Sequence, residues 1–266
     1  MKKLLITDLD GTLLNNNKDV SSVNKKAIID FKKKDGNIVV LASGRNASGM
    51  KYLLEEVECE KTLVSSNGAS IFDGENNIIL DQINFDNKQL SKLHKLYKEM
   101  GIFMLFSAED MIYYFEANET IVSRSKSFRE GNITQISDVS DIKEGITKTL
   151  FIFDEKNKDK KDIARKEVLS RVSNIEVSES ADNLLDITPK GATKARAIDY
   201  FNKDNEYKIY AIGDNENDIP MLQQADVSFA MGSATDLVKN NATYTTADCK
   251  HDGVAKAIYR ILNEDI

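Results

Sequence analysis

Residues 4–13, Leu-Leu-Ile-Thr-Asp-Leu-Asp-Gly-Thr-Leu, join an apolar run to two carboxylates. The run is typical of a buried strand, and it ends at Asp8 and Asp10. Side chains at positions i and i+2 of a strand point the same way, so the two carboxylates are candidates for one site, although a bend at Gly11 leaves their directions open. Because two close anions repel each other, a cation such as Mg²⁺ would keep both ionised. The alternative is an ordinary strand-end turn, in which Asp and Gly are common.

A second apolar run ends in the same way. Residues 207–212 lead into a cluster that contains Asp214 and Asp218, and the runs at 37–45 and 62–68 also end in polar residues. Ligands of a parallel sheet bind at the carboxyl ends of its strands, so endings that are distant in sequence meet at one crevice. The four endings therefore predict one polar crevice and weaken the turn alternative.

Four short motifs follow one another along the chain. They are Asp8-Leu-Asp10-Gly-Thr-Leu, Ser43-Gly44-Arg45, Lys190 within Thr-Pro-Lys-Gly-Ala-Thr-Lys194, and Gly213-Asp214-Asn-Glu-Asn-Asp218. Their order and spacing over nearly the whole chain resemble the haloacid dehalogenase superfamily of phosphohydrolases, and more narrowly its Cof-type branch. The segment Ser65-Ser66-Asn67-Gly68-Ala69 is similar to the same branch. One motif alone is weak support, whereas four in order are strong.

The composition of the chain limits the classes of molecule that it is expected to bind. The 266 residues are 41% hydrophobic and carry a net charge of −7, with no long basic run, which disfavours a nonspecific nucleic-acid binder. A small phosphorylated metabolite remains a suitable partner. The sequence contains no stretch of eighteen apolar residues and no cleavable leader, so we expect a soluble, cytoplasmic protein without membrane contacts. Nothing in the pattern indicates an oligomeric state.

The few cysteines and histidines exclude other classes of site. Cys59 and Cys249 are far apart in sequence and have no metal-ligand spacing, which argues against a disulfide framework or a zinc site. His94 and His251 have no Ser or Cys partner suggestive of a triad. A histidine-based hydrolase is therefore disfavoured.

Strands and helices alternate in the first part of the chain. We expect a helix from Ser21 or Ser22 to about Lys34, a strand at 37–42, a helix at about 47–56 and a strand at 62–65. This alternation indicates a parallel sheet covered on both faces. Residues 73–77 are typical of a hairpin turn.

From about residue 84 the pattern changes. We expect a helix at 87–100, strands at 111–115 and 147–154, and a charge-dense turn that leads into a helix ending near Arg171. The resemblance implies an α/β cap between the second and third motifs, where this change falls. The expected fold is thus α/β, with a Rossmann-like parallel-sheet core (residues 1–83 and 187–266) and an inserted α/β cap domain (residues 84–186).

The resemblance also implies roles for the carboxylates. Asp8 is implied as the nucleophile that forms an aspartyl-phosphate, and Asp10 as the acid for the leaving group and then the base for water. A carboxylate suits the first role because it needs no deprotonation at neutral pH. The implied Mg²⁺ ligands are the Asp8 carboxylate, the Asp10 backbone carbonyl and Asp214, and Asp218 binds or orients the metal sphere.

The implied phosphate site is built from other motifs. Ser43 and the Gly44 amide would hold the phosphate, Asn217 would contact it, and Lys190 would balance its charge. Lys194 lies one helical turn further on and competes for that role. The match at Pro-Lys-Gly favours Lys190.

The roles of several other cationic and aromatic residues remain open. Arg45 either belongs to the site or pairs with a surface carboxylate. Residues 113–115 (Tyr-Tyr-Phe), Arg124 and Arg129 of the cap are candidates for lining the pocket, although cap core and solvated surface are the commoner places for such residues.

The function expected on these grounds is that of a Mg²⁺-dependent phosphatase for a small phosphate monoester such as a sugar phosphate. A phosphomutase, which passes the phosphoryl group to another hydroxyl, is the nearest alternative. A noncatalytic regulator that senses a metabolite is an alternative from another class. The intact Asp8, Asp10, Lys190 and Asp214 argue against the regulator.

Overall fold

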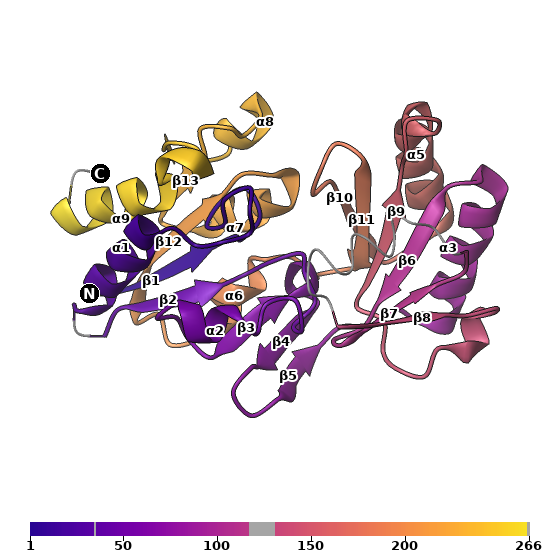
Figure 1. The fold of residues 1–266 in the computed structure, drawn as a ribbon, viewed down its shortest axis with the longest axis horizontal. Coiled ribbons are helices and arrows are strands. Elements are labelled where there is room, and N and C mark those ends of the chain that lie inside the picture. The colour runs from indigo at the N-terminus through magenta and orange to yellow at the C-terminus, as the bar shows by residue number, and fades with distance from the viewer. Residues whose placement is uncertain (35, 117–130, 265–266) are drawn as a thin grey trace.

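The computed structural model describes residues 1–34, 36–116 and 131–264. The chain forms a mixed α/β fold in two parts that lie side by side in Figure 1, a core with the first and last described elements and an inserted cap. Arg124 and Arg129 lie outside the described residues. Among the helices that the structure describes, none is long and apolar enough to cross a membrane.

A five-stranded sheet with the order β14-β13-β12-β1-β2 forms the centre of the core. All its neighbouring strands are parallel, as predicted, so their carboxyl ends meet at one edge. The strands are β1 (Lys2–Thr7), β2 (Ile38–Leu41), β12 (Tyr207–Gly213), β13 (Val227–Ala230) and β14 (Tyr244–Thr245).

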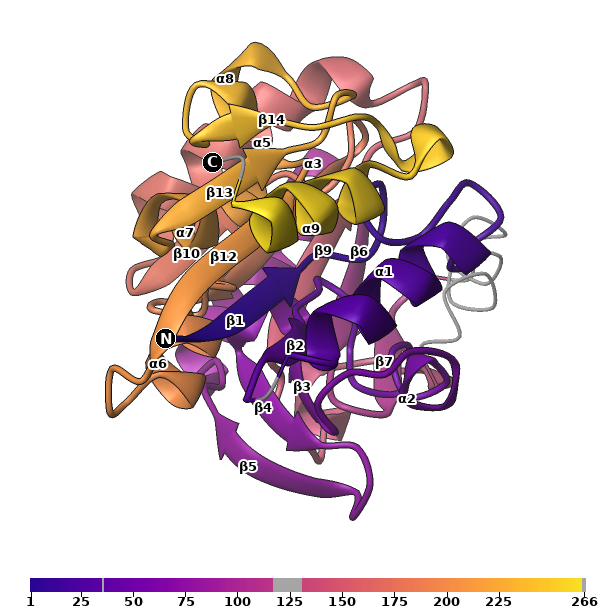
Figure 2. The same cartoon turned by 90° about the vertical axis from the view of Figure 1, so that its left-hand side faces the viewer.

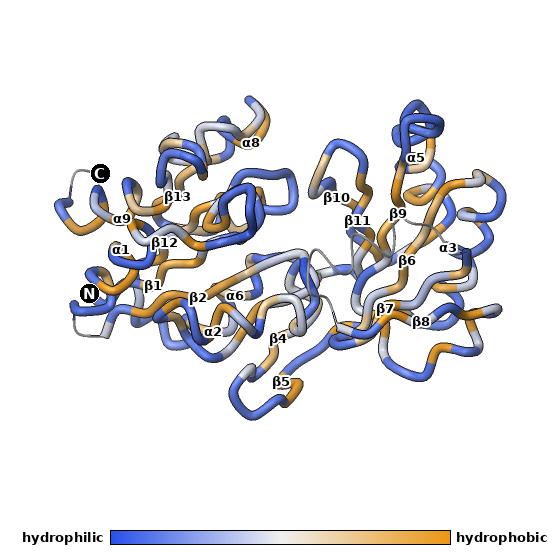
Figure 3. Tube along the Cα trace, in the orientation of Figure 1, coloured by the Kyte–Doolittle hydropathy of each residue, from blue (hydrophilic) through white to orange (hydrophobic). Residues whose placement is uncertain are grey.

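Helices cover both faces of this sheet. Leu5 packs with α1 (Ser22–Lys32) and α9 (Gly253–Asn263), which lie in front of the sheet in Figure 2. Leu4 and Ile6 pack on the opposite face with α6 (Arg196–Phe201) and α7 (Ile219–Gln224). A strand between two helical layers needs apolar side chains at consecutive positions, which explains the continuous run in β1. The central strands of both large sheets are accordingly hydrophobic, and the turns are hydrophilic (Figure 3). A short helix, α8 (Asp236–Lys239), follows β13.

The helix expected at 47–56 is confined to α2 (Leu53–Glu56), and residues 49–52 form turns. The Gly49 N–H donates to Asn46 Oδ1 (3.1 Å), and the Gly49 carbonyl accepts from Arg45 Nη1 (3.1 Å). Side chains thus take the backbone groups that a helix would use.

A smaller antiparallel sheet, β3-β4-β5, extends the core. It consists of β3 (Thr62–Ser65), β4 (Ser70–Asp73) and β5 (Ile78–Gln82), and the predicted hairpin turn connects the last two. β3 joins the parallel sheet only through the bridge between Ala42 and Val64, so this strand departs from the expected alternation.

The cap is built on a six-stranded sheet with the order β10-β11-β9-β6-β7-β8. All neighbouring strands are antiparallel except β7 and β8. The strands are β6 (Phe103–Ser107), β7 (Met111–Tyr114), β8 (Asn132–Gln135), β9 (Lys148–Ile152), β10 (Ile175–Ser178) and β11 (Leu184–Pro189). β11 runs through the expected boundary at residue 186 and belongs to the cap sheet as far as Pro189.

Two helices of the described part of the cap, both expected from the sequence, cover one face of the cap sheet. They are α3 (Asn87–Met100) and α5 (Lys161–Arg171), and their apolar side chains share a core with Phe106 and Phe151. Tyr113 and Phe115 belong to or pack against this core, where the Phe115 ring stacks on His94 at 4.1 Å. The aromatic run at 113–115 therefore serves the cap interior.

Candidate active site

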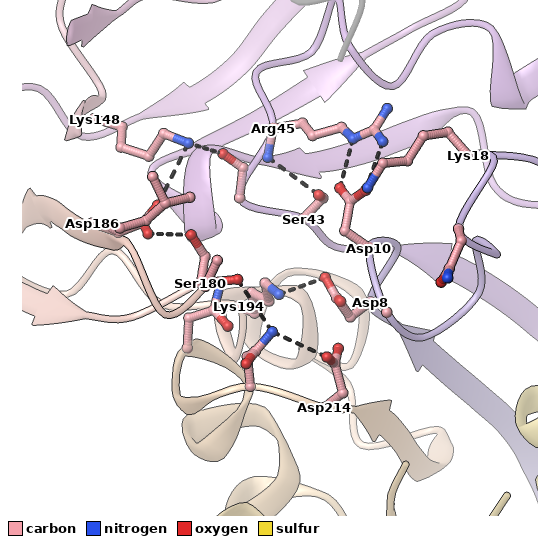
Figure 4. A pocket seen from close by; sticks show the side chains of 17 residues that line it. Asp8, Asp10, Lys18, Ser43, Arg45, Lys148, Ser180, Asp186, Lys194 and Asp214 are labelled. Carbon is pink, nitrogen blue, oxygen red and sulfur yellow. Dashed lines mark hydrogen bonds and ion pairs between the residues drawn. The ribbon is translucent and has the colours of Figure 1, made fainter. Parts of the chain in front are cut away.

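A pocket of about 350 Å³ lies where the carboxyl ends of the parallel strands face the cap. Asp8 follows β1, Asp214 follows β12 and Ser43 comes two residues after β2, so three neighbouring strands deliver polar side chains to one place. The predicted convergence of distant strand endings is thus present, and Figure 4 shows the side chains that line it.

Asp8 forms a buried ion pair with Lys194. The Lys194 ammonium donates to Asp8 Oδ1 and to Asp218 Oδ1, each at 2.6 Å, and its side chain is only 1% exposed. Burial alone would lower the pKa of Lys194, but the two carboxylates outweigh that effect and raise it. The lysine is therefore charged, and it fixes the direction of the Asp8 carboxylate.

This geometry corrects the preference for Lys190 over Lys194. Lys190 is exposed at the end of β11, and its backbone N–H donates to the carbonyl of Asn174. The chain then turns at Gly191, whose φ is +83°, before Lys194 enters the pocket. The match at Pro-Lys-Gly located the right segment but not the residue that faces the carboxylates.

Three carboxylates, those of Asp8, Asp214 and Asp218, place one oxygen each within 4.8 Å of one another. Burial raises the pKa of Asp8, and the charges of Asp218 and Asp214 add to this rise, although the charge of Lys194 opposes it. Burial and the charge of Asp218 raise the pKa of Asp214 to about 7. These carboxylates are crowded and poorly solvated, which is the condition that a divalent cation relieves, so the donor set fits a hard metal ion such as Mg²⁺.

The members of this cluster are not equivalent. Asp214 Oδ1 accepts from the Thr12 hydroxyl at 2.8 Å. Asp218 Oδ2 accepts the backbone N–H groups of Asp214 and Asn215, both at 2.9 Å, while its Oδ1 is bonded to Lys194. Asp218 therefore orients the turn and the lysine, which leaves Asp8 and Asp214 as the carboxylates best placed for an ion.

The backbone at Gly11 is shaped by this cluster. Its φ of +86° lies in the left-handed region, and a Cβ at this position would overlap the Asp214 carboxylate. A side chain is excluded on both grounds. The glycine that follows Asp10 is thus what allows the loop to pass close to Asp214.

Asp10 turns away from the carboxylate cluster. Its oxygens accept from Arg45 Nε (2.7 Å), Arg45 Nη2 (2.8 Å) and Lys18 Nζ (2.7 Å). Burial would raise the pKa of Asp10, but the hydrogen bonds and charges of these two cations lower it to about 2. Arg45 therefore belongs to the site and not to the surface, and Asp10 is ionised in this arrangement.

The predicted phosphate ligands also line the pocket. Ser43 is buried, and its Oγ accepts the Arg45 N–H at 3.2 Å, which leaves its own proton to donate. Asn217 donates to Asn67 Oδ1 at 2.9 Å, while its own Oδ1 is buried and has no hydrogen-bond partner among the described residues. In this orientation Asn217 suits a hydroxyl donor better than a phosphate oxygen.

The cap supplies pocket residues that sequence reasoning missed. Lys148 is the first residue of β9, and Asp186 lies within β11. Their side chains are 5% and 1% exposed, respectively. A signal was present in the sequence, since Asp186 interrupts the apolar run Leu-Leu-Asp-Ile. A carboxylate in the middle of a buried strand requires a partner.

Comparisons with known proteins agree with this arrangement. Residues 5–258 match the family of haloacid dehalogenase-like hydrolases. The 5-amino-6-(5-phospho-D-ribitylamino)uracil phosphatase YcsE of Bacillus subtilis is 30% identical over 262 residues, which cover 96% of this chain and 94% of the relative. YwtE of the same organism, a phosphatase named for the same compound, is 29% identical, with 98% of each chain covered.

Solved structures share the fold. A haloacid dehalogenase-like hydrolase from Bacteroides thetaiotaomicron is 29% identical and has a TM-score of 0.82, with 98% of this chain and 100% of that chain covered. The subclass IIB sugar phosphatase BT4131 has a TM-score of 0.83 at 24% identity, with 98% of this chain and 99% of that chain covered. The parallel-sheet core with an inserted cap is therefore an architecture found in these proteins.

Proposed function

Because this chain belongs to the haloacid dehalogenase-like hydrolases and is a phosphatase of that family, we propose that it hydrolyses a small phosphate monoester in a Mg²⁺-dependent reaction. The substrate class that we propose is a sugar phosphate. The observation that carries this proposal is the ion pair between Asp8 and buried Lys194 on the wall of a polar pocket. The proposed cap comprises residues 84–186, with β11 extending it to Pro189.

Asp8 is the proposed nucleophile. A carboxylate oxygen of Asp8 attacks phosphorus, a bond forms between them, and the bond from phosphorus to the leaving oxygen breaks. Lys194 contributes in two ways, because it holds Asp8 in place and carries the positive charge next to the incoming phosphate. Water then attacks the aspartyl-phosphate and releases inorganic phosphate and the free carboxylate.

Asp10 is the proposed proton carrier. It gives a proton to the leaving alkoxide in the first step and accepts one from the attacking water in the second. A carboxyl group with a pKa of about 2 holds almost no proton at neutral pH. Asp10 therefore has to separate from Arg45 before it serves as the acid, and the pair that it forms with Arg45 and Lys18 is a resting arrangement.

The remaining polar groups bind the phosphate and the ion. Asp8, Asp214 and the Asp10 backbone carbonyl would hold Mg²⁺, which when bound supplies positive charge opposite the phosphoryl oxygens. The Ser43 hydroxyl and the Gly44 N–H donate to the phosphate. Asn217 contacts the substrate through its unpartnered Oδ1.

The proposal is tested by phosphate release over a panel of sugar phosphates, nucleotides and 5-amino-6-(5-phospho-D-ribitylamino)uracil, with Mg²⁺ and with excess chelator. We expect release with Mg²⁺, loss with chelator and recovery when the ion is restored. Full activity in excess chelator would exclude the metal-dependent mechanism. A requirement for a bisphosphate activator would indicate a phosphomutase, and binding without turnover would indicate a metabolite sensor.

The nucleophile has a test of its own. Asp8→Asn keeps the shape of the side chain but removes its nucleophilic charge, so turnover should be abolished while the fold is retained. Asp204→Asn, in an exposed turn, is the matched control and should leave turnover unchanged. Near-normal phosphate release by pure Asp8→Asn protein would rule out Asp8 as the nucleophile.

A further inference from the structure

A buried ion pair on the cap side of the pocket has no part in the chemistry described above. Lys148 Nζ lies 3.6 Å from Asp186 Oδ1, and both side chains are at least nine-tenths buried. Lys148 also donates to the carbonyl of Gly44, and Ser180 donates its hydroxyl to Asp186 Oδ2. Figure 4 shows this group on the wall of the pocket away from Asp10. The cap thus reaches the loop proposed to hold the phosphate.

Stability does not explain the pair. Taking two charges out of water costs roughly several kcal/mol per ion. Apolar residues of similar volume are often at least as stabilising as a buried ion pair. A buried ion pair that also lines a cavity is better explained by what it offers a ligand. Its position, with an ammonium and a carboxylate side by side, offers a donor and an acceptor together.

Both groups have unused hydrogen-bonding capacity. An ammonium has three donors, of which Lys148 gives one to the Gly44 carbonyl and points a second toward Asp186. Among the described residues, the third is left for a ligand. A carboxylate accepts about four hydrogen bonds, whereas Asp186 accepts those from Ser180 and, at 3.4 Å, from Asn67 Nδ2, besides its ion pair. The pair therefore remains able to bind a group that both donates and accepts, such as a hydroxyl.

The charges of the described lining residues favour a neutral leaving group over an anionic one. The cap contributes only two charged side chains to the described lining, and they balance each other. The cations on the opposite wall, Lys18 and Arg45, are both bonded to Asp10. A second anionic group beside Asp186 would be repelled as strongly as Lys148 attracts it. None of the described lining residues is aromatic, so this part of the pocket offers a planar base no surface to stack on.

We propose that Lys148 and Asp186 form the specificity-determining pair of the pocket, and that they bind a hydroxyl of a neutral polyol leaving group. This inference rests on the proposed phosphatase function. Lys148 donates to the hydroxyl oxygen, and Asp186 accepts the hydroxyl proton.

The experiment compares kcat/KM for pairs of substrates that differ at one terminal group, which is neutral in one member and anionic in the other. Sorbitol 6-phosphate and 6-phosphogluconate share a linear skeleton and differ in a terminal hydroxymethyl or carboxylate group. Glycerol 3-phosphate and 3-phosphoglycerate form a smaller pair of the same kind, and p-nitrophenyl phosphate has no hydroxyl to recognise. The proteins are the wild type, Lys148→Met, Lys148→Arg, Asp186→Asn and the control Lys156→Met, which removes an exposed cap lysine.

We expect the wild type to prefer the neutral member of each pair. In Lys148→Met, kcat/KM for the neutral polyols should fall about 10- to 100-fold further than that for p-nitrophenyl phosphate, which is the loss of one charged hydrogen bond. Lys148→Arg should restore part of this loss. Asp186→Asn leaves Lys148 unbalanced, so the ratio within each pair should move about tenfold toward the carboxylate. Lys156→Met should behave as the wild type.

The outcomes separate this inference from the function on which it rests. A wild type that prefers the anionic members would overturn the inference, as would an equal loss for every substrate in both Lys148→Met and Asp186→Asn. If Asp186→Asn fails to fold, the two Lys148 variants decide. Absence of phosphate release from all five substrates and from the wider panel would contradict the proposed function itself.

Discussion

At the scale of single residues, Asp10 depends on Arg45 for its charge state. Arg45 makes two of the three hydrogen bonds to the Asp10 carboxylate and is 3% exposed, so little water competes for it. Arg45→Met should raise the pKa of Asp10 from about 2 toward the ordinary value of an aspartate. The measurement is a carbon NMR titration of labelled aspartate carboxyls. Lys18→Met should produce a smaller rise, since Lys18 makes one hydrogen bond to the Asp10 carboxylate and is 33% exposed. An unchanged titration of Asp10 in Arg45→Met would contradict this account.

If Asp214 binds the proposed Mg²⁺, its raised pKa should make metal binding dependent on pH. The pKa of its carboxyl is raised to about 7 by burial and by Asp218, so the cation-free protein holds a proton there below that pH. A metal ion has to displace this proton, and its affinity therefore falls as pH decreases. If Mg²⁺ binding releases one proton from a group with this pKa, the affinity for Mg²⁺ should be about tenfold lower at pH 6 than at pH 8. Titration calorimetry in two buffers of different ionisation enthalpy measures both the affinity and the proton. Equal affinity at the two pH values would show that Asp214 is ionised before the ion arrives.

Most of the site residues predicted from the sequence line the pocket, but their individual contacts could not be predicted. Asp8, Asp214 and Ser43 were predictable because each follows an apolar strand of a parallel sheet, and the strand ends meet. Lys190 and Lys194 could not be distinguished, since the choice depends on how the chain turns at Gly191. Asp10 was expected beside Asp8, but its side chain turns toward Arg45 and binds it. Arg45 is a long-range partner that periodicity does not reveal.

At the scale of elements, the turn between β6 and β7 docks the cap on the core. Glu109 Oε2 accepts from Ser65 Oγ (3.2 Å) and from the Ala47 N–H (3.3 Å). The same turn accepts the Ser48 N–H at the Glu109 carbonyl (3.3 Å) and Asn46 Nδ2 at the Ala108 carbonyl (3.2 Å). Burial raises the pKa of Glu109 although these neutral donors oppose it. The cap is thus anchored at a buried carboxyl group.

The raised pKa of Glu109 has a consequence for stability. A carboxyl group whose pKa is higher in the folded state binds its proton more tightly there, so its contribution to the free energy of unfolding is present at low pH and is lost as pH rises through the folded pKa. Glu109→Gln removes the ionisable group. As pH rises from 5 to 8, the free energy of unfolding of this variant should therefore increase relative to that of the wild type. Urea denaturation at both pH values measures the difference. Glu75→Gln, in an exposed turn, is the control and should show no such trend. Glu109→Ala leaves buried donors unpaired and should lose about 1–3 kcal/mol.

Some helices could be predicted from the sequence and others could not. The helices α1, α3 and α5 follow from apolar spacing and from caps such as Ser21, whose Oγ accepts the Asn24 N–H at 3.0 Å. The segment at 47–56 has a suitable composition but forms mostly turns, because Arg45 and Asn46 bind the backbone of Gly49. Tertiary contacts of this kind outweigh local propensity and cannot be derived from spacing.

At the scale of the whole molecule, we propose that the chemistry and the selection of substrate come from different parts of the chain. Asp8, Asp214 and Lys194 belong to the core, whereas Lys148 and Asp186 come from the cap sheet. The parallel order of the core strands explains why distant motifs meet, and this much followed from the sequence. The way the cap closes the pocket did not, because it depends on two strands, β9 and β11, whose pairing brings Lys148 beside Asp186.

Exchange of the cap should therefore redirect specificity and leave the chemistry unchanged. The exchanged segment is residues 84–189, so that β11 is moved as a whole strand with its partners, and the donor is a relative with a different substrate preference. We expect the order of kcat/KM over the phosphate-release panel to follow the donor, while sensitivity to chelator is retained. The same chimera carrying Asp8→Asn is the control and should be inactive, since the proposed nucleophile remains in the core. Folding of the chimera is checked first by circular dichroism and thermal unfolding. An unchanged order of substrates would place specificity in the core, and loss of all turnover in a folded chimera would mean that the cap supplies a group required for the reaction.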